Sequence, residues 1–249
     1  MDKLDDLISG KIFIGGPCTI EDRDQVFRLA EKVKNAGADF FRAGAFKPRT
    51  SPYSFQGLGE KGLKILSELK KAFDIPVVSE IVDPRHIDMF EDIDVLQVGA
   101  RNMQNFQLLK ELGKTDKYIL LKRGMGSTVD ELISASEYIT SQGNKRVILC
   151  ERGIRTFETT TRYTLDISSI SEVKKRTDLK IIVDPSHAMG RASFVRSAAL
   201  AGVAAGADGL IIEVHDRPEE ALVDKDQAIL PGEFERIIRE AKQIINIIE

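Results

Sequence analysis

Eight short apolar segments, rich in β-branched residues, are spread along the 249-residue chain, and an amphipathic helical stretch follows each of them. Each segment has four or five residues, as expected for parallel strands that are buried on both faces. The segments comprise residues 11–14, 39–42, 76–80, 95–98, 118–122, 146–150, 180–183 and 209–213. This regular alternation of strand and helix constrains the fold more than any other feature of the sequence.

The alternation predicts an α/β protein built as a single closed (β/α)8 TIM barrel. A barrel of this kind usually has roughly 250 residues. The composition does not change along the chain, so we expect one catalytic domain over residues 1–249 and no separate regulatory domain. The helical stretch 22–35 is typical, with Val26, Leu29 and Val33 on one face, and the stretch 232–248 has the same spacing. An open, doubly wound sheet is the alternative fold.

Loop lengths indicate which end of the barrel carries the function. The helix-to-strand turns are short, at residues 74–75, 92–93 and 178–179. Three strand-to-helix loops are long, at residues 43–59, 151–166 and 214–231. Long loops in a compact domain are usually functional, and barrels place their active sites at the C-terminal ends of the strands.

Two helix-to-strand turns share a sequence. Segments 35–39 and 204–208 both contain the order Ala-Gly-Ala-Asp at the end of a helix and the start of a strand. Glycine at this position permits the left-handed turn that stops a helix, so we expect two similar turns.

Charge and composition exclude several classes of function. The net charge is −3, aromatic residues make up 6% of the chain and tryptophan is absent, which argues against binding to nucleic acid or to an anionic membrane. No apolar run approaches the roughly 20 residues of a membrane span. The acidic N-terminus lacks an apolar signal segment, so we expect a cytoplasmic protein. The two cysteines, Cys18 and Cys150, argue against a disulfide framework.

Six basic side chains follow the C-terminal ends of the predicted strands and would meet at one rim of the barrel. They are Arg42, Lys47, Arg49, Arg101, Lys122 and Arg152. Such a cluster, in a chain of negative net charge, attracts small and multiply charged anions. Arginine matches phosphate and carboxylate groups in shape, and backbone N–H groups at Gly99, Ala100 and Arg101 would add donors. Each cation taken alone would be interpreted as a solvated surface charge.

Four other side chains have the chemistry of metal ligands, namely Cys18, His187, Glu213 and Asp224. Thiolate, imidazole and carboxylate groups together suit manganese, iron, cobalt or zinc. The first strand adjoins the eighth when a barrel closes, so we expect Cys18 to lie close to the ligands from the last two strands. The alternative is that Cys18 is a small buried hydrophobic residue and His187 is only hydrogen-bonded. We interpret Cys150, at the end of the sixth strand, as a core residue.

Seven segments carry a family resemblance. They are Gly16-Pro17-Cys18, Lys47-Pro48-Arg49-Thr50-Ser51-Pro52-Tyr53, Gly99-Ala100-Arg101, Leu121-Lys122-Arg123-Gly124, Cys150-Glu151-Arg152-Gly153, Asp184-Pro185-Ser186-His187 and Glu213-Val214-His215. In these segments the sequence resembles the 3-deoxy-D-arabino-heptulosonate 7-phosphate (DAHP) synthases, in particular the short, barrel-only form of type I-beta. The resemblance implies the condensation of phosphoenolpyruvate with D-erythrose 4-phosphate, the first step of the shikimate pathway to aromatic amino acids.

The resemblance also implies a metal centre. Cys18, His187, Glu213 and Asp224 would hold one divalent ion, with manganese expected first and iron, cobalt or zinc as alternatives. Lys225 follows Asp224 where the family usually has glycine. The family suggests a homotetramer. A barrel without an added domain is expected to escape inhibition by aromatic amino acids unless a partner protein supplies control.

The substrate-binding roles implied by the resemblance use the cationic set. Arg42, Lys47 and Lys122 would face the carboxylate of phosphoenolpyruvate, whereas Arg101, the Ala100 backbone and Arg152 would hold its phosphate. Lys47, Arg49 and Thr50 would shape the site for the aldose phosphate, and Glu80, at the end of the third strand, would also line the substrate site.

Three residues are expected to be catalytic: Lys47, Cys18 and His187. Lys47 would lie between the two substrates and protonate the new alkoxide, with a pKa lowered by the neighbouring cations. Cys18 would act only through the metal.

Three alternative functions remain open at this point. One is the sister reaction of 3-deoxy-D-manno-octulosonate 8-phosphate synthase, which uses arabinose 5-phosphate; Pro48 after Lys47 favours erythrose 4-phosphate instead. A second is a catalytically silent regulatory barrel, although no expected ligand or anion-binding residue is missing. A metal-dependent aldolase or phosphosugar isomerase on the same fold is the third.

Overall fold

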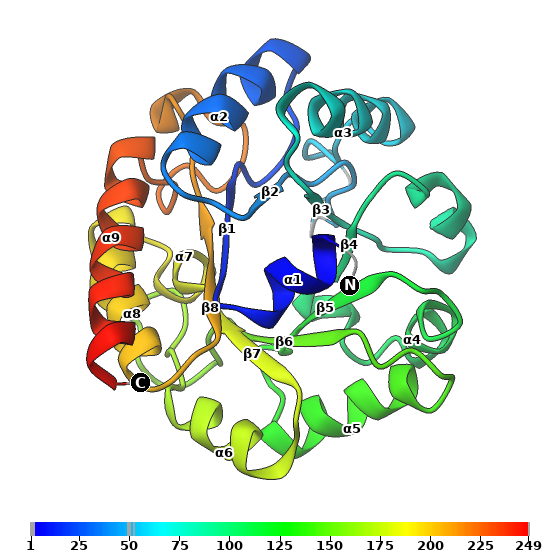
Figure 1. Cartoon of the computed structure of the whole chain (residues 1–249), viewed down its shortest axis with the longest axis vertical. Coiled ribbons are helices and arrows are strands. Elements are labelled where there is room, and N and C mark those ends of the chain that lie inside the picture. Colours follow the sequence, from blue (N-terminus) through cyan, green and yellow to red (C-terminus); the bar gives the residue numbers. More distant parts are fainter. Residues whose placement is uncertain (1–2, 49–50, 52, 249) are drawn as a thin grey trace.

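Eight parallel strands close into a barrel in the order of the chain, and β8 is hydrogen-bonded to β1 (Figure 1). The computed structural model describes residues 3–48, 51 and 53–248. The strands are β1 (Ile12–Gly16), β2 (Phe40–Arg42), β3 (Val77–Glu80), β4 (Val95–Val98), β5 (Tyr118–Lys122), β6 (Val147–Glu151), β7 (Lys180–Val183) and β8 (Gly209–Glu213). The closed barrel confirms the predicted fold and excludes the open sheet.

Helices surround the barrel on its outer side (Figure 1). In the described residues they are α2 (Arg23–Asn35), α3 (Glu60–Phe73), α4 (Phe106–Leu112), α5 (Val129–Thr140), α6 (Ser168–Arg176), α7 (Pro185–Met189), α8 (Ala192–Ala204) and α9 (Pro231–Ile248). The α2 helix begins one residue later than predicted because Asp22 is its N-cap, accepting a hydrogen bond from the Gln25 backbone nitrogen at 2.8 Å. None of these helices is both long enough and apolar enough to cross a membrane.

The sequence predicted an amphipathic helical stretch after every strand, and this prediction is wrong for the segment after β3. A 3-10 helix, Pro84–Phe90, makes this connection. Phe90 is the buried residue of that segment, so little apolar surface is available to stabilise a full α-helix there.

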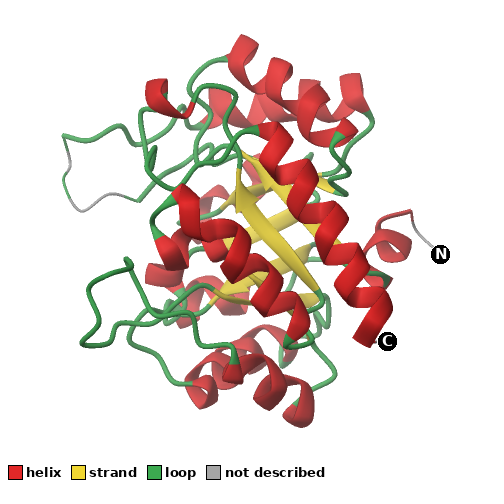
Figure 2. Ribbon diagram, turned by 90° about the vertical axis from the view of Figure 1, so that its left-hand side faces the viewer, coloured by secondary structure: helices red, strands yellow, loops and turns green. Residues whose placement is uncertain are grey.

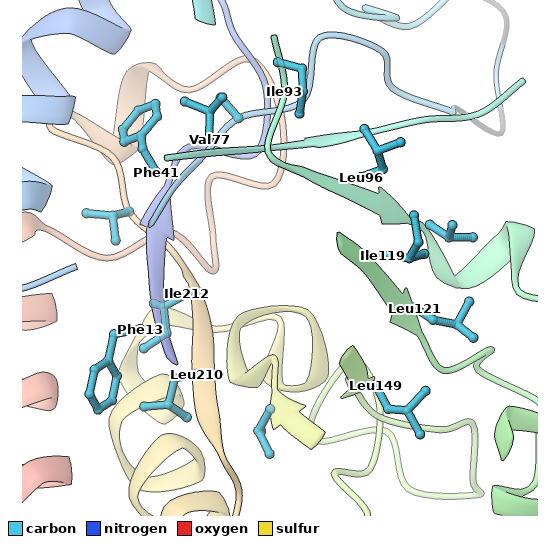
Figure 3. Close-up of a cluster of buried hydrophobic side chains, with 14 of the residues drawn as sticks. Phe13, Phe41, Val77, Ile93, Leu96, Ile119, Leu121, Leu149, Leu210 and Ile212 are labelled. Carbon is cyan, nitrogen blue, oxygen red and sulfur yellow. The ribbon is translucent and has the colours of Figure 1, made fainter. Parts of the chain in front are cut away.

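Alternate residues of each strand face opposite sides of the barrel wall. Ile12, Ile14 and Cys150 belong to the cluster that fills the barrel, which confirms Cys150 as a core residue. Phe13 and Leu210 belong to the larger cluster between the strands and the helices, and Figure 3 shows both pointing away from the barrel axis. This two-sided burial explains why the strands read as nearly continuous apolar runs.

A helix that the sequence analysis did not anticipate, α1 (Lys3–Ser9), lies across the N-terminal opening of the barrel (Figure 1). Its residue Ile8 packs with the strands' inward-facing residues. The Tyr118 hydroxyl donates to Asp5 at 2.7 Å, and the Lys180 ammonium donates to the Ser9 carbonyl at 2.8 Å. The N-terminal end of the barrel is therefore covered, which leaves the opposite end for a binding site.

The two turns with a shared sequence adopt the same conformation. Gly37 and Gly206 both have φ +95°. The aspartate two residues later has the same task in each turn: Asp39 accepts a hydrogen bond from the Phe13 backbone at 2.8 Å, and Asp208 accepts one from the Ile181 backbone at 2.9 Å. Each carboxylate thereby ties the start of its strand to the neighbouring strand.

The long loops lie together on the side of the barrel away from both termini, on the left in Figure 2. They follow the C-terminal ends of β2, β6 and β8, as the loop lengths predicted. The fold thus gathers residues from distant parts of the chain at one rim.

The packing between barrel and helices predicts which phenylalanine stabilises the fold. Phe234 in α9 is fully buried against Gly15 of β1, whereas Phe157 is 98% exposed. We expect Phe234→Ala to lower the free energy of unfolding by about 3–5 kcal/mol, and Phe157→Ala to change it by less than about 0.5 kcal/mol. Urea unfolding of both variants measures this difference, and equal effects would contradict the packing described.

Candidate active site and metal centre

Strand ends deliver polar side chains to one rim. Arg42 ends β2, Lys122 ends β5 and Glu213 ends β8, while Cys18 follows β1 by two residues. The turn that brings Cys18 inward depends on Gly16, which has φ +144°. A Cβ atom at Gly16 would lie 2.1 Å from the Arg42 carbonyl oxygen, so only glycine fits between β1 and β2.

The four side chains predicted as metal ligands meet at this rim. One ligand atom from each of Cys18, His187, Glu213 and Asp224 lies within 4.8 Å of the others. Cys18 Sγ is 3.1 Å from Asp224 Oδ2, and His187 Nε2 is 3.3 Å from Glu213 Oε1. One sulfur, one imidazole nitrogen and two carboxylates suit a borderline divalent transition metal, so these residues fit such an ion.

Charges around the cluster keep its carboxylates ionised. Burial opposes ionisation of Glu213, yet His187 and Arg42 lower its pKa to about 2. Burial likewise opposes ionisation of Asp224, yet Lys47 and His187 hold its pKa below the ordinary value. Burial raises the pKa of the Cys18 thiol, and Glu213 raises it further. A thiolate at Cys18 would therefore require a strongly bound cation, and binding of that cation would release a proton.

Asp184, directly after β7, orients His187. Its carboxylate accepts from His187 Nδ1 at 2.8 Å and from the His187 backbone nitrogen at 2.9 Å. The same carboxylate pairs with the Lys122 ammonium. Burial lowers the pKa of His187, which favours the neutral imidazole. With Nδ1 donating to Asp184, His187 presents Nε2 to the cluster as a lone-pair donor.

A cleft of about 270 Å³ opens beside the cluster, and a narrower part of about 50 Å³ continues from it toward β3 and β5. Both parts are lined by Lys47, Pro48, Ala100, Arg101, Arg152 and His187. Glu80 and Lys122 line the narrower part. The five predicted cations that the structure describes, Arg42 included, therefore meet at one cleft together with Glu80 and Ala100.

These cations fall into two classes. Arg42 pairs with Glu213 at 2.8 Å, Lys47 pairs with Asp224 at 3.1 Å, and Lys122 pairs with Asp184. Within the described part of the chain, Arg101 and Arg152 make no ion pair. Arg152 is only 5% exposed, and one of its terminal nitrogens is buried without a hydrogen-bond partner. A buried guanidinium that faces a cleft without an ion-pair partner among the described residues indicates an anion-binding site.

Lys47 does not have the electrostatic environment that we predicted. Its ammonium lies 2.5 Å from Cys18 Sγ and 3.1 Å from Asp224 Oδ2. Burial lowers the pKa of Lys47, but Cys18 and Asp224 outweigh burial and raise the pKa above its ordinary value. The expected lowering by neighbouring cations is therefore wrong for this arrangement, because anions lie closer to Lys47 than cations do.

Two predicted site residues, Arg49 and Thr50, lie outside the described residues. The lysine that departs from the family pattern is placed without strain. Asp224 itself has the left-handed conformation, with φ +55°, and aspartate tolerates it. Lys225 is not among the described residues with positive φ, so this position does not require glycine.

Sequence reasoning missed two residues that contact the cluster. Arg162, in the loop between β6 and α6, donates to Asp224 Oδ1 at 3.2 Å. Gln227, in the loop between β8 and α9, donates to Glu213 Oε2 at 2.6 Å. Neither lies at a strand end, which was the signal used to find the other residues.

Comparisons with known proteins show which family the chain resembles. The chain matches the DAHP synthetase I family over residues 9–249. It is 46% identical over 232 residues to a phospho-2-dehydro-3-deoxyheptonate aldolase from Thermotoga maritima, covering 93% of this chain and 69% of that protein. It is 30% identical over 259 residues to a 2-dehydro-3-deoxyphosphooctonate aldolase from Geobacter sulfurreducens, covering 96% and 93% of the two chains.

Solved structures show the same similarity. The crystal structure of the Thermotoga maritima phospho-2-dehydro-3-deoxyheptonate aldolase (DAHP synthase) superposes with a TM-score of 0.92 and 44% identity, covering 96% of this chain and 70% of that chain. A truncated form of 3-deoxy-D-arabino-heptulosonate 7-phosphate synthase from Thermotoga maritima gives a TM-score of 0.88 and 40% identity, covering 96% and 87%.

The cluster geometry predicts different roles for the two buried cysteines. We expect Cys18→Ser to lose at least tenfold in affinity for cobalt and to lose the thiolate-to-cobalt absorption. The reason is that the hard hydroxyl oxygen of serine replaces the soft thiolate ligand. Cys150→Ser should leave both unchanged, since Cys150 lies in the barrel core. Equilibrium dialysis with absorption spectra measures both properties. A Cys18→Ser protein that kept full metal affinity would contradict the assignment.

Proposed function

The chain belongs to the DAHP synthetase I family, and we propose that it condenses phosphoenolpyruvate with D-erythrose 4-phosphate to give DAHP and phosphate, the first step of the shikimate pathway. One observation carries the proposal. Two arginines without ion-pair partners, Arg101 and Arg152, line a cleft beside a Cys-His-Glu-Asp cluster within the described residues. The reaction needs both a site for phosphorylated anions and a divalent ion.

Phosphoenolpyruvate carries a phosphate and a carboxylate, and the cleft offers cations for both. We assign the phosphate to Arg101, Arg152 and the backbone at Ala100, because the two arginines lack anionic partners among the described residues. We assign the carboxylate to the side of Arg42, Lys47 and Lys122. These cations offset the repulsion between two anionic substrates and fix how the substrates approach each other.

The Cys-His-Glu-Asp cluster would hold a divalent ion for the reaction of the aldehyde. A divalent ion held by Cys18, His187, Glu213 and Asp224 would polarise the aldehyde oxygen of the sugar as a Lewis acid. We propose manganese, and iron, cobalt or zinc also match the donor set. Asp184 supports this role by fixing the orientation of His187.

Lys47 is our candidate for the proton donor. The methylene carbon of phosphoenolpyruvate attacks the aldehyde carbon, water adds to the cationic carbon that results, and phosphate leaves by C–O cleavage. The aldehyde oxygen needs a proton, and Lys47 holds one at neutral pH next to the cluster and the cleft. Lys47 donates to Cys18 Sγ and to Asp224 Oδ2, so its ammonium lies where it can give a proton to an oxygen beside the cluster.

The alternative acceptor is arabinose 5-phosphate. The chain is 46% identical to the heptonate aldolase but only 30% identical to the octonate aldolase described above, which favours erythrose 4-phosphate. Pro48 after Lys47 also favours erythrose 4-phosphate. The roles proposed for Arg49 and Thr50 in binding the sugar phosphate rest on the sequence alone. We further expect a cytoplasmic homotetramer of single-barrel chains that binds neither nucleic acid nor membrane.

The proposed reaction predicts a defined substrate and metal requirement. Purified protein treated with a chelator should consume no phosphoenolpyruvate, and restored manganese should permit turnover with erythrose 4-phosphate but not with arabinose 5-phosphate. The loss of absorbance of phosphoenolpyruvate follows the reaction. A preference for arabinose 5-phosphate would transfer the protein to the sister reaction, and no turnover with either sugar would contradict the proposal.

The acid role predicts a large effect of Lys47 on turnover. We expect Lys47→Ala to lower kcat by about 10²–10⁴-fold, the usual contribution of a positioned acid. Lys64→Ala is the matched control, because Lys64 is an exposed helix residue that pairs with Glu60. Metal content is measured in both variants, since Lys47 touches two ligands. A rise in KM with unchanged kcat would show that Lys47 serves binding alone.

A further inference from the structure

Two residues connect the outer sides of the cluster's carboxylates. Arg162 donates to Asp224 Oδ1 at 3.2 Å and to Gln227 Oε1 at 3.0 Å, and Gln227 Nε2 donates to Glu213 Oε2 at 2.6 Å. These contacts form an unbroken path from Asp224 through Arg162 and Gln227 to Glu213. We call Arg162 and Gln227 the carboxylate bridge.

Each carboxylate divides its oxygens between the bridge and the cluster. Asp224 Oδ2 contacts Cys18 Sγ and Lys47 Nζ, both at 3.1 Å, whereas Oδ1 contacts Arg162. Glu213 Oε1 lies 3.3 Å from His187 Nε2, whereas Oε2 accepts from Gln227. The bridge therefore fixes the rotation of both carboxylates and turns one oxygen of each toward the other ligands.

The bridge is also tied to the backbone that carries the remaining parts of the site. The Arg162 backbone nitrogen donates to the Met189 carbonyl at 3.1 Å, and Met189 ends α7, the helix that contains His187. The Gln227 backbone nitrogen donates to the Asp224 carbonyl at 3.2 Å, which closes the turn where Asp224 is left-handed. Gln227 is 1% exposed, and its amide is used at both ends.

From this geometry we propose that Arg162 and Gln227 are positioning residues that orient Glu213 and Asp224 for the divalent ion. The inference rests on the metal centre of the proposed function and deepens it. Metal affinity then depends on the loop between β6 and α6, which also supplies Arg152 to the anion-binding cleft. Tyr163, which directly follows Arg162 in the sequence, lies under the Arg152 guanidinium at 4.2 Å and near that of Arg162 at 5.7 Å.

Charge and positioning predict opposite effects of Arg162. A cation near a metal site repels the metal, so charge alone predicts tighter binding when Arg162 is removed. Positioning predicts weaker binding. Arg162 is paired directly with Asp224 and its side chain is 35% exposed, so solvent and the carboxylate screen its charge. The positioning effect should therefore dominate.

The test measures metal affinity and spectrum without turnover. Arg162→Ala, Gln227→Ala and the double variant are titrated with cobalt, with Arg155→Ala as a control from an exposed position of the same loop. We expect each bridge variant to lose about 10–100-fold in cobalt affinity, the usual loss for partners of metal ligands, and to shift the visible cobalt bands. The double variant should lose little more than the worse single variant, because both residues serve one bridge. Arg155→Ala should match the wild type.

Arg162→Lys separates a local effect from a folding defect. An ammonium can still donate to Asp224 and Gln227, so this variant should recover part of the lost affinity. Circular dichroism and the unfolding midpoint check that all variants fold. No recovery in Arg162→Lys, unchanged or tighter cobalt binding in Arg162→Ala, or additive losses in the double variant would overturn the proposal.

Failure of this proposal and failure of the proposed reaction are distinguishable. Wild-type protein that shows no thiolate-to-cobalt absorption would overturn both the bridge and the metal centre. Wild-type protein that binds cobalt through the thiolate, but turns over neither sugar, would contradict only the reaction.

Discussion

The pairing of β1 with β8 is the interaction on which the rest of the site depends. This pair runs in register from Ile12 opposite Gly209 to Gly16 opposite Glu213. The register places Glu213 beside the turn that carries Cys18, although 195 positions separate them in the sequence. Gly16 permits the close approach of the Arg42 backbone from β2. Closure of the barrel thus creates the cluster, and the loop that follows β8 adds Asp224.

Charge compensation explains why so many ionisable groups can lie together at this rim. Cys18 and Glu213 are buried and Asp224 is partly buried, which is costly for charged groups unless cations offset them. Arg42, Lys47 and Arg162 contact these groups directly. Arg101 and Arg152 have no such partner within the described residues, so they remain available for anions that enter the cleft. The same rim therefore combines cations that pair with the cluster and two arginines that we propose bind the anionic substrate.

The sequence predicted most of the barrel and of the cluster, because both follow from residues at regular positions. Apolar runs marked the strands, and the residue after each run marked the rim. It did not predict α1, because the few apolar residues of this short helix are buried only by packing against the residues inside the barrel opening. It also missed Arg162 and Gln227, which lie inside irregular loops and meet only because those loops fold toward each other. The shift in the pKa of Lys47 was predicted in the wrong direction. The sequence does not show that Cys18 and Asp224 lie closer to the Lys47 ammonium than the neighbouring cations do.

We propose that one divalent ion binds at Cys18, His187, Glu213 and Asp224 beside an anion site at Arg101 and Arg152. Crystals grown with manganese and phosphoenolpyruvate test it directly through the anomalous scattering of the metal. We expect one strong anomalous peak within bonding distance of all four side chains, with the phosphate of the substrate against both arginines. A peak at another place, or one that lies beyond bonding distance of Cys18, would contradict this proposal.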